Sequence, residues 1–339
     1  MENFSQDVAV NKAENGAAVK AANKAVNKAA TGSPTGMNPR AILKGLFRSR
    51  YLYLMFFPVI VFYIIFHYLP MYGLIIAFKD FSAAKGIWDS PWVGFKHFQN
   101  FMSSIYFWRL IWNTIGINIY ELVVGFPAPI ILALIINEVR KEKFKKAVQT
   151  IVYLPNFIST VVVAGMIIAF LSPSSGIVNH FIKALGGQPI HFLAEPAWFQ
   201  SIYVWSGVWQ FCGWGSIIYL AALAGIDVQL YEAATVDGAN SWQKLIHITL
   251  PGIIPTIVIL LILRMGSIFS VGYEKIILLY NPQTYETADV ISTYVYRRGI
   301  LDADFSYSSA ISLFNNVINF VMLVLVNKFS SKVSETSLW

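Results

Sequence analysis

Long runs of apolar residues, separated by shorter polar stretches, are the dominant pattern along this chain of 339 residues. A helix needs about 20 predominantly apolar residues to cross the hydrocarbon core of a bilayer. Six runs approach or exceed that length: 51–77, 111–136, 151–171, 202–224, 253–279 and 310–326. The pattern therefore predicts an all-α integral membrane protein with six transmembrane helices.

The segments outside these runs predict the organisation of the chain. Residues 1–50 repeat Asn-Lys-Ala among alanines and glycines, a composition too poor in large apolar side chains to bury a core. We expect a basic, disordered tail there. Residues 51–327 would form the six-span domain with a polar loop at 227–251, and residues 328–339 a short second tail.

Composition and charge agree with a membrane protein and indicate its orientation. Hydrophobic residues make up 56% of the chain and charged residues only 13%, whereas a soluble domain is about a quarter charged. Lys and Arg concentrate in the first tail and between the second and third runs, which predicts that this side is cytoplasmic. Both termini and the loop 227–251 then lie inside. The net charge of +7 reflects topology, so no nucleic-acid partner is expected.

The loop at 227–251 carries the strongest local signals. Asp227 can cap one short helix, and Gly238 can end it because glycine accepts the left-handed conformation that helix ends often need. Asn240 and Ser241 can cap a second short helix, and Pro251 marks its end or a kink. We expect two short helices joined by a bend at the membrane surface.

Six residues of this loop resemble the EAA loop of permease subunits in binding-protein-dependent ABC importers: Glu232, Ala233, Ala234, Asp237, Gly238 and Ala239. The following Ile248 and Leu250-Pro251 fit the same pattern, and 154–159 resembles the sugar-uptake branch. In that family the loop docks into a cleft on a separate ATPase subunit. The alternative is an ordinary amphipathic helix–turn–helix between two spans.

The resemblance covers most of the chain from Tyr51 onward and implies a type I ABC importer permease in the bacterial cell membrane. The implied partners are a second permease, either a homologue or a copy of this chain, two ATPase subunits that hold ATP and Mg, and an external solute-binding protein. The implied cargo is an oligosaccharide. No cofactor is expected on this chain itself.

Candidate substrate-pathway residues lie in the third and fourth runs. In sugar permeases the corresponding part of the fourth run lines the pathway, which implicates Trp209, Gln210 and Trp214, and aromatic faces with amides suit sugars. An aromatic stripe against lipid or a neighbouring helix is the alternative. Asn156, Ser159 and Thr160 follow the helix-disrupting Pro155 and either line a central cavity or bond between helices.

The fifth run contains Arg264 and Ser267, and the second contains Glu121. An ionisable side chain within a span is expensive and is a functional hypothesis by default. Arg264 is 13 residues beyond Pro251, which predicts a mid-membrane position at 1.5 Å per residue. Either Glu121 pairs with it, or a wet cavity there receives an acidic sugar. In sugar permeases the related position faces the substrate path.

Several motifs of catalysis are absent from the sequence. It contains no G-x-x-x-x-G-K-[ST] phosphate loop, no H-E-x-x-H and no G-x-S-x-G. We therefore expect a transport subunit with no metal site. Two other classes remain compatible with the residues: an ion-coupled secondary carrier using Glu121 and Arg264, and an integral-membrane enzyme acting on a sugar or lipid. ATP dependence and turnover by the purified chain would separate them.

Overall fold

A computed structural model describes residues 50–333 of the protein. The predicted tail at 1–50 lies almost wholly outside this range, as do residues 334–339. The chain divides into two compact units, Met1–Met71 and Tyr72–Trp339, and each is considered by itself. The described part of the first unit is helical, with exposed apolar side chains along nearly its whole length: α3 (Arg50–Tyr63), the π-helical turn η1 (Ile64–Tyr68) and α4 (Leu69–Met71).

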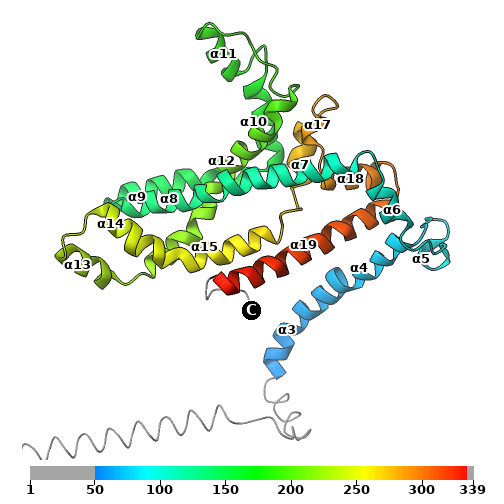
Figure 1. The fold of residues 1–339 in the computed structure, drawn as a ribbon, viewed down its shortest axis with the longest axis horizontal. Helices are drawn as coiled ribbons and strands as arrows, with labels where there is room; N and C mark the ends of the chain where they lie inside the picture. The colour runs from blue at the N-terminus through cyan, green and yellow to red at the C-terminus, as the bar shows by residue number, and fades with distance from the viewer. Residues whose placement is uncertain (1–49, 334–339) are drawn as a thin grey trace, which may run out of the picture. The chain divides into compact units, whose positions relative to one another are not determined.

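The described residues of the second unit are also helical, apart from connecting turns and two isolated β-bridges (Figure 1). In chain order its elements are η2 (Tyr72–Phe78), α5 (Gly86–Asp89), α6 (Lys96–Met102), α7 (Phe107–Tyr120), η3 (Glu121–Gly125), α8 (Pro127–Glu138), α9 (Glu142–Tyr153), η4 (Leu154–Phe157), α10 (Thr160–Leu171), α11 (Ile177–Ala184), α12 (Pro196–Ala224), α13 (Val228–Val236), α14 (Ser241–Lys244), η5 (Leu245–Thr249), α15 (Leu250–Met265), α16 (Tyr273–Leu279), α17 (Tyr285–Ala288), α18 (Ile291–Tyr296), η6 (Arg297–Leu301) and α19 (Phe305–Val333).

Five helical segments among the described residues are long and apolar enough to cross a membrane: Tyr51–Phe78, Phe107–Glu138, Pro196–Ala224, Ser241–Met265 and Phe305–Ser330. A sixth crossing requires the pair Glu142–Phe157 and Thr160–Leu171, whose axes differ by 97°. The span predicted at 151–171 is therefore not one continuous helix but is divided by a bend. Pro155 lies within the 3-10 turn η4, Ile158 is extended, and Ser159 then starts α10 by accepting a hydrogen bond from the Val162 amide at 3.4 Å.

The fifth span ends earlier than the run 253–279 predicted. Helix α15 stops at Met265, so Arg264 lies in its last turn. A Cβ on Gly266 would lie 2.7 Å from Leu323, which shows how closely α19 approaches this turn. Asn319 of α19 accepts a hydrogen bond from the Phe269 amide at 3.0 Å. This bond satisfies the amide of Phe269, which lies in the turn beyond the end of the helix.

Helix α12 is the central packing element of the second unit. It contacts α8 and α15 as well as the bend at η4. A buried apolar cluster joins these helices: Ala133, Tyr219, Leu223 and Ile253. At Gly213 the approach is tightest, because a Cβ there would stand 1.9 Å from the carbonyl oxygen of Val152 in α9.

Two further clusters of buried apolar side chains join other helices of the second unit. One, which includes Ile117, Val204 and Ile276, joins α7, α12 and α16. The other, which includes Phe101 and Ile311, joins α6, α7, α18 and α19. Helices α15 and α19 lie side by side (yellow and red in Figure 1) and are in contact. Helix α19 continues to Val333, so the tail predicted to begin at residue 328 starts inside this helix.

Candidate functional site

The polar loop forms a bent element with the predicted caps. Asp227 accepts a hydrogen bond from the Gln229 amide at 2.9 Å and starts α13. Gly238 has a φ of +78°, so the left-handed turn predicted after α13 is confirmed. Asn240 and Gln243 form a reciprocal capping box, with Oδ1 of Asn240 accepting from the Gln243 amide at 2.9 Å.

The second half of the loop differs from the prediction. Instead of a separate short helix, α14 continues through the π-helical turn η5 into α15, and Ser241–Met265 forms one helical segment. Pro251 comes directly after the π-helical turn η5, and the helix continues through it as α15. The prediction that Pro251 ends this helix was wrong; the helix is irregular at η5, just before the proline, and continuous with the fifth span.

Two side-chain hydrogen bonds, which could not be predicted from the sequence, close the bend. Nζ of Lys244 donates to Oγ1 of Thr235 at 2.8 Å. The hydroxyls of Tyr231 and Thr249 are 2.9 Å apart. These two contacts tie α13 to the start of the fifth span.

The six EAA-like residues lie together on this element. Glu232, Ala233 and Ala234 belong to α13, and Asp237, Gly238 and Ala239 form the turn that follows it. Most of them are exposed, and Glu232 forms no ion pair with another described residue. Apolar side chains on the same element are exposed as well, among them Leu230, Val236 and Trp242.

Glu121 and Arg264 form an ion pair in the second unit. Of the two arrangements left open for Arg264, the structure contains this pairing. Oδ1 of Asn118 accepts a further hydrogen bond from the guanidinium at 3.3 Å. Ser267 is nearby, and its hydroxyl donates to the carbonyl oxygen of Arg264 at 2.9 Å. The pair borders a cavity of about 240 Å³ between η3, α8 and α12.

Lys275 is a second cation near this pair, and the sequence analysis did not identify it as a candidate. Its side chain is only 7% exposed, and Nζ donates to the carbonyl oxygen of Tyr203 at 3.0 Å. A Cβ on Gly207 would lie 3.7 Å from this Nζ and 3.8 Å from Oε1 of Glu121. Burial lowers the pKa of Lys275 to about 8, and the Glu121 carboxylate opposes that shift.

The three candidates in α12 occupy different surroundings. Trp209 is half exposed and lines a cavity of about 290 Å³ together with Met166 and Ser206. Trp214 is also half exposed and packs edge to face on Phe157, with ring centroids 5.7 Å apart.

Gln210 is buried instead. Its side-chain amide nitrogen, Nε2, donates a hydrogen bond to the carbonyl oxygen of Ile158 at 2.9 Å. This bond supports the bend between α9 and α10. Its Oε1 has no hydrogen-bond partner among the described residues. The candidates at the bend also divide. Ser159 uses its hydroxyl as the cap of α10, while Asn156 lies in η4 and Thr160 in the first turn of α10. A transport role for these residues stays a prediction.

Comparison with known proteins identifies the family. Residues 125–335 match the family described as the binding-protein-dependent transport system inner membrane component. The chain belongs to this family. The permease is also similar to Protein LplB of Bacillus subtilis, with 41% identity over 304 residues that cover 90% of this chain and 95% of LplB. Its 300-residue match to YteP of the same species, a polygalacturonan/rhamnogalacturonan transport system permease protein, is 40% identical and covers 88% and 94% of the two chains.

A solved structure supports the same conclusion. The permease matches a chain of a bacterial alginate ABC transporter in complex with an alginate pentasaccharide-bound periplasmic protein. The TM-score is 0.81 at 47% identity, and the match covers 87% of this chain and 99% of that chain. The protein is therefore a multi-pass transport subunit with a type I importer fold and not an enzyme. Family membership favours the importer over the ion-coupled carrier and the membrane enzyme that the sequence left open.

Proposed function

We propose that the permease carries an acidic oligosaccharide along a pathway that passes the Glu121–Arg264 pair. The charge of this cluster is the observation that carries the proposal, because Arg264 and Lys275 are two cations facing the single carboxylate of Glu121. Net charge inside a membrane protein is expensive. An anionic cargo would offset it, and a guanidinium fork binds a carboxylate with two hydrogen bonds.

The relatives support the same cargo class. YteP is named for polygalacturonan/rhamnogalacturonan transport, and a second structure that matches with a TM-score of 0.81 is described as importing the acidic polysaccharide alginate. The exposed faces of Trp209 and Trp214 can stack on sugar rings, as aromatic residues commonly do in ligand sites. Asn156, Ser159, Thr160, Gln210 and Ser267 complete the proposed pathway.

The proposed mechanism is alternating access in a larger complex. Two ATPase subunits, which bind ATP and Mg, close around nucleotide and move the coupling elements of this chain and a second permease. The cavity then opens outward and receives oligosaccharide from an external solute-binding protein. Hydrolysis returns the cavity to the inward-facing state and releases the cargo into the cytoplasm.

The coupling contact is proposed to be the segment from Glu232 to Ala239. Its exposed apolar neighbours Leu230 and Val236 would be covered by the cleft of an ATPase subunit. The free carboxylate of Glu232 can pair with a basic side chain there. Because Lys244 ties α13 to the start of the fifth span, movement of the ATPase would reach Arg264 at the far end of α15.

This assignment places both termini and the coupling segment on the cytoplasmic side. Single cysteines at Ser241 and Asp304 test the orientation with a membrane-impermeant thiol reagent in intact cells. We expect position 304 to react from outside, and position 241 to react only after the membrane is permeabilised. Reaction of position 241 in intact cells would overturn the orientation and the coupling role together.

The cargo is tested by uptake into proteoliposomes that contain the complete importer. A uronate-containing oligosaccharide and a neutral one of equal length are compared for the unmodified permease and Arg264→Gln. We expect the substitution to abolish uptake of the acidic sugar selectively. Equal loss of both sugars would argue for a structural role of Arg264. The double variant Glu121→Gln/Arg264→Gln, which removes the ion pair but keeps the net charge of the cluster, serves as the control for membrane insertion.

A further inference from the structure

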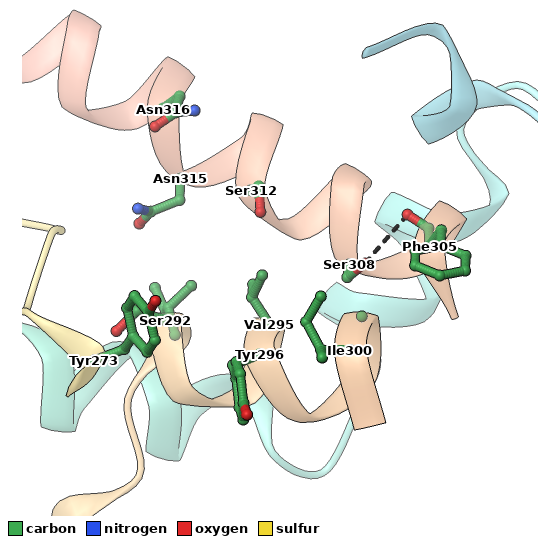
Figure 2. A pocket seen from close by; sticks show the side chains of 12 residues that line it. Tyr273, Ser292, Val295, Tyr296, Ile300, Phe305, Ser308, Ser312, Asn315 and Asn316 are labelled. Carbon is green, nitrogen blue, oxygen red and sulfur yellow. Dashed lines mark hydrogen bonds between the residues drawn. The ribbon is translucent and has the colours of Figure 1, made fainter. Parts of the chain in front are cut away.

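A second cavity, separate from the Glu121–Arg264 pair, opens between α19 and the segment formed by α18 and η6. Its volume is about 410 Å³, which falls within the range of cavities that hold small-molecule ligands. Figure 2 shows Ser312, Asn315 and Asn316 of α19 on one side and Ser292, Val295 and Tyr296 of α18 on the other. None of the residues that line this cavity is charged.

One wall of the cavity is aromatic. The rings of Tyr273 and Tyr296 stack with centroids 5.8 Å apart and an angle of 21° between their planes. Tyr273 is 44% exposed. Across residues 50–333, no hydrogen bond to the hydroxyl of either tyrosine occurs. The pair therefore offers an apolar surface with free hydroxyls at its edge.

The opposite wall carries one amide oxygen without a partner. Oδ1 of Asn315 is buried and accepts no hydrogen bond from any other described residue. Asn319, one turn further along the same helix, differs: its Nδ2 donates to Ser270 at 2.9 Å and its Oδ1 accepts from Phe269 at 3.0 Å. Since a buried amide is costly without partners, more so away from water, Asn315 points to a ligand that completes its hydrogen bonds.

We propose that this cavity is a second sugar subsite, which binds one pyranose ring of the transported oligosaccharide. The inference rests on the proposed function of the permease as an oligosaccharide carrier. The apolar C–H face of the ring would lie against Tyr273 and Tyr296, and its hydroxyls would bond to Asn315, Asn316 and Ser312. The cavity recognises hydroxyls and leaves the sugar carboxylate unpaired, because no cation lines it.

The subsite and the charged cluster divide the recognition of the cargo. The cavity beside Glu121 and Arg264 shares no lining residue with this one. An oligosaccharide long enough to occupy both would gain binding from each. Substitutions in the uncharged subsite should therefore affect long oligosaccharides more than short ones. They should not change the preference for acidic over neutral sugar.

Thiol protection tests occupancy directly. Ser312→Cys is alkylated in the complete importer, with binding protein and ATP, in the absence and presence of a uronate tetrasaccharide, and the modified peptide is quantified by mass spectrometry. We expect the sugar to slow the reaction several-fold. The control is Val321→Cys, a 47% exposed position of α19 that does not line the cavity, whose rate should not change.

Two outcomes would overturn the subsite. Equal rates at position 312 with and without sugar would mean that the cavity stays empty during transport. Reaction in the isolated permease but none in the assembled importer, whatever the sugar, would mean that a partner subunit fills it.

Uptake by Asn315→Leu and Tyr296→Leu separates this inference from the proposed function. We expect both variants to insert normally, to lose uptake of the tetrasaccharide and to retain more uptake of the disaccharide. If the unmodified importer takes up neither sugar, the proposed function itself fails. If the unmodified importer transports, Arg264→Gln does not, and both variants match the unmodified protein at every chain length, only the subsite is wrong.

Discussion

Glu121 and Arg264 are 143 positions apart in the sequence, and their ion pair joins the turn after α7 to the last turn of α15. Their side chains remain 28% and 34% exposed, respectively, beside a cavity. The pair thus compensates two charges within the helical bundle and stays within reach of a ligand. Under the proposed function, a cargo carboxylate would compete with Glu121 for this guanidinium.

Removing Glu121 alone should destabilise the protein more than removing both members of this pair. Glu121→Gln leaves two cations, Arg264 and Lys275, with no carboxylate in a poorly solvated site, whereas the double variant leaves only Lys275. We expect each single variant, Glu121→Gln and Arg264→Gln, to lower the melting temperature of the purified complex by several degrees. The double variant should fall by less than the sum of the two shifts. Additive shifts would show that the two side chains do not stabilise one another.

Gly238 should be replaceable only by a residue that tolerates a positive φ. A Cβ at this position meets no atom within 4 Å, so the cost of Gly238→Val is conformational, about 1–2 kcal/mol. We expect the valine variant to insert in the membrane but lose stimulation of ATP hydrolysis by loaded binding protein. Gly238→Asn is the matched control, because asparagine visits the left-handed region. Full stimulation in the valine variant would refute the coupling role of this turn.

Gly213 should not accept even a methyl group. The added Cβ would meet the backbone of Val152, which cannot rotate away as a side chain can. Overpacking of this kind costs about 1–3 kcal/mol or more. We therefore expect Gly213→Ala to lower the melting temperature and the yield of folded permease. Gly165→Ala, in α10 with open space around it, should be neutral or slightly stabilising. Equal behaviour of the two variants would contradict the close approach of α12 and α9.

Lys275 should make stability depend on pH above neutrality. Burial lowers its pKa to about 8 in the folded protein, below the value of about 10.4 in an unfolded chain. Between these values the unfolded chain binds more protons, so stability should increase as pH rises. We expect the melting temperature of the unmodified complex, relative to Lys275→Met, to rise from pH 8 to pH 10.

Lys275→Arg provides the control, because its charge persists across this window. The melting temperature of Lys275→Arg, measured relative to Lys275→Met, should not rise from pH 8 to pH 10 as that of the unmodified protein does. A difference that is flat with pH, or that falls, would show that the ammonium of Lys275 is not desolvated in the folded complex.

Much of this protein is determined by the sequence alone. The apolar runs decide that it is helical and membrane-spanning, because only helices and closed barrels satisfy every backbone group in lipid. Asp227, Gly238 and Asn240 decide the caps and the turn of the loop at 227–251, since capping depends on neighbouring residues and local backbone conformation. These signals act over a few positions, and the structure contains each of them.

Only the tertiary structure decided which polar groups meet and where helices end. Apolar runs do not reveal that α15 stops at Met265 or that a 97° bend divides the third span, because neighbouring helices satisfy the freed backbone groups. Nor does a sequence indicate that Lys275 is buried near Glu121, or that Asn315 lacks the partners that Asn319 has. Such pairings join residues far apart in the chain, so the packing of the helices determines them.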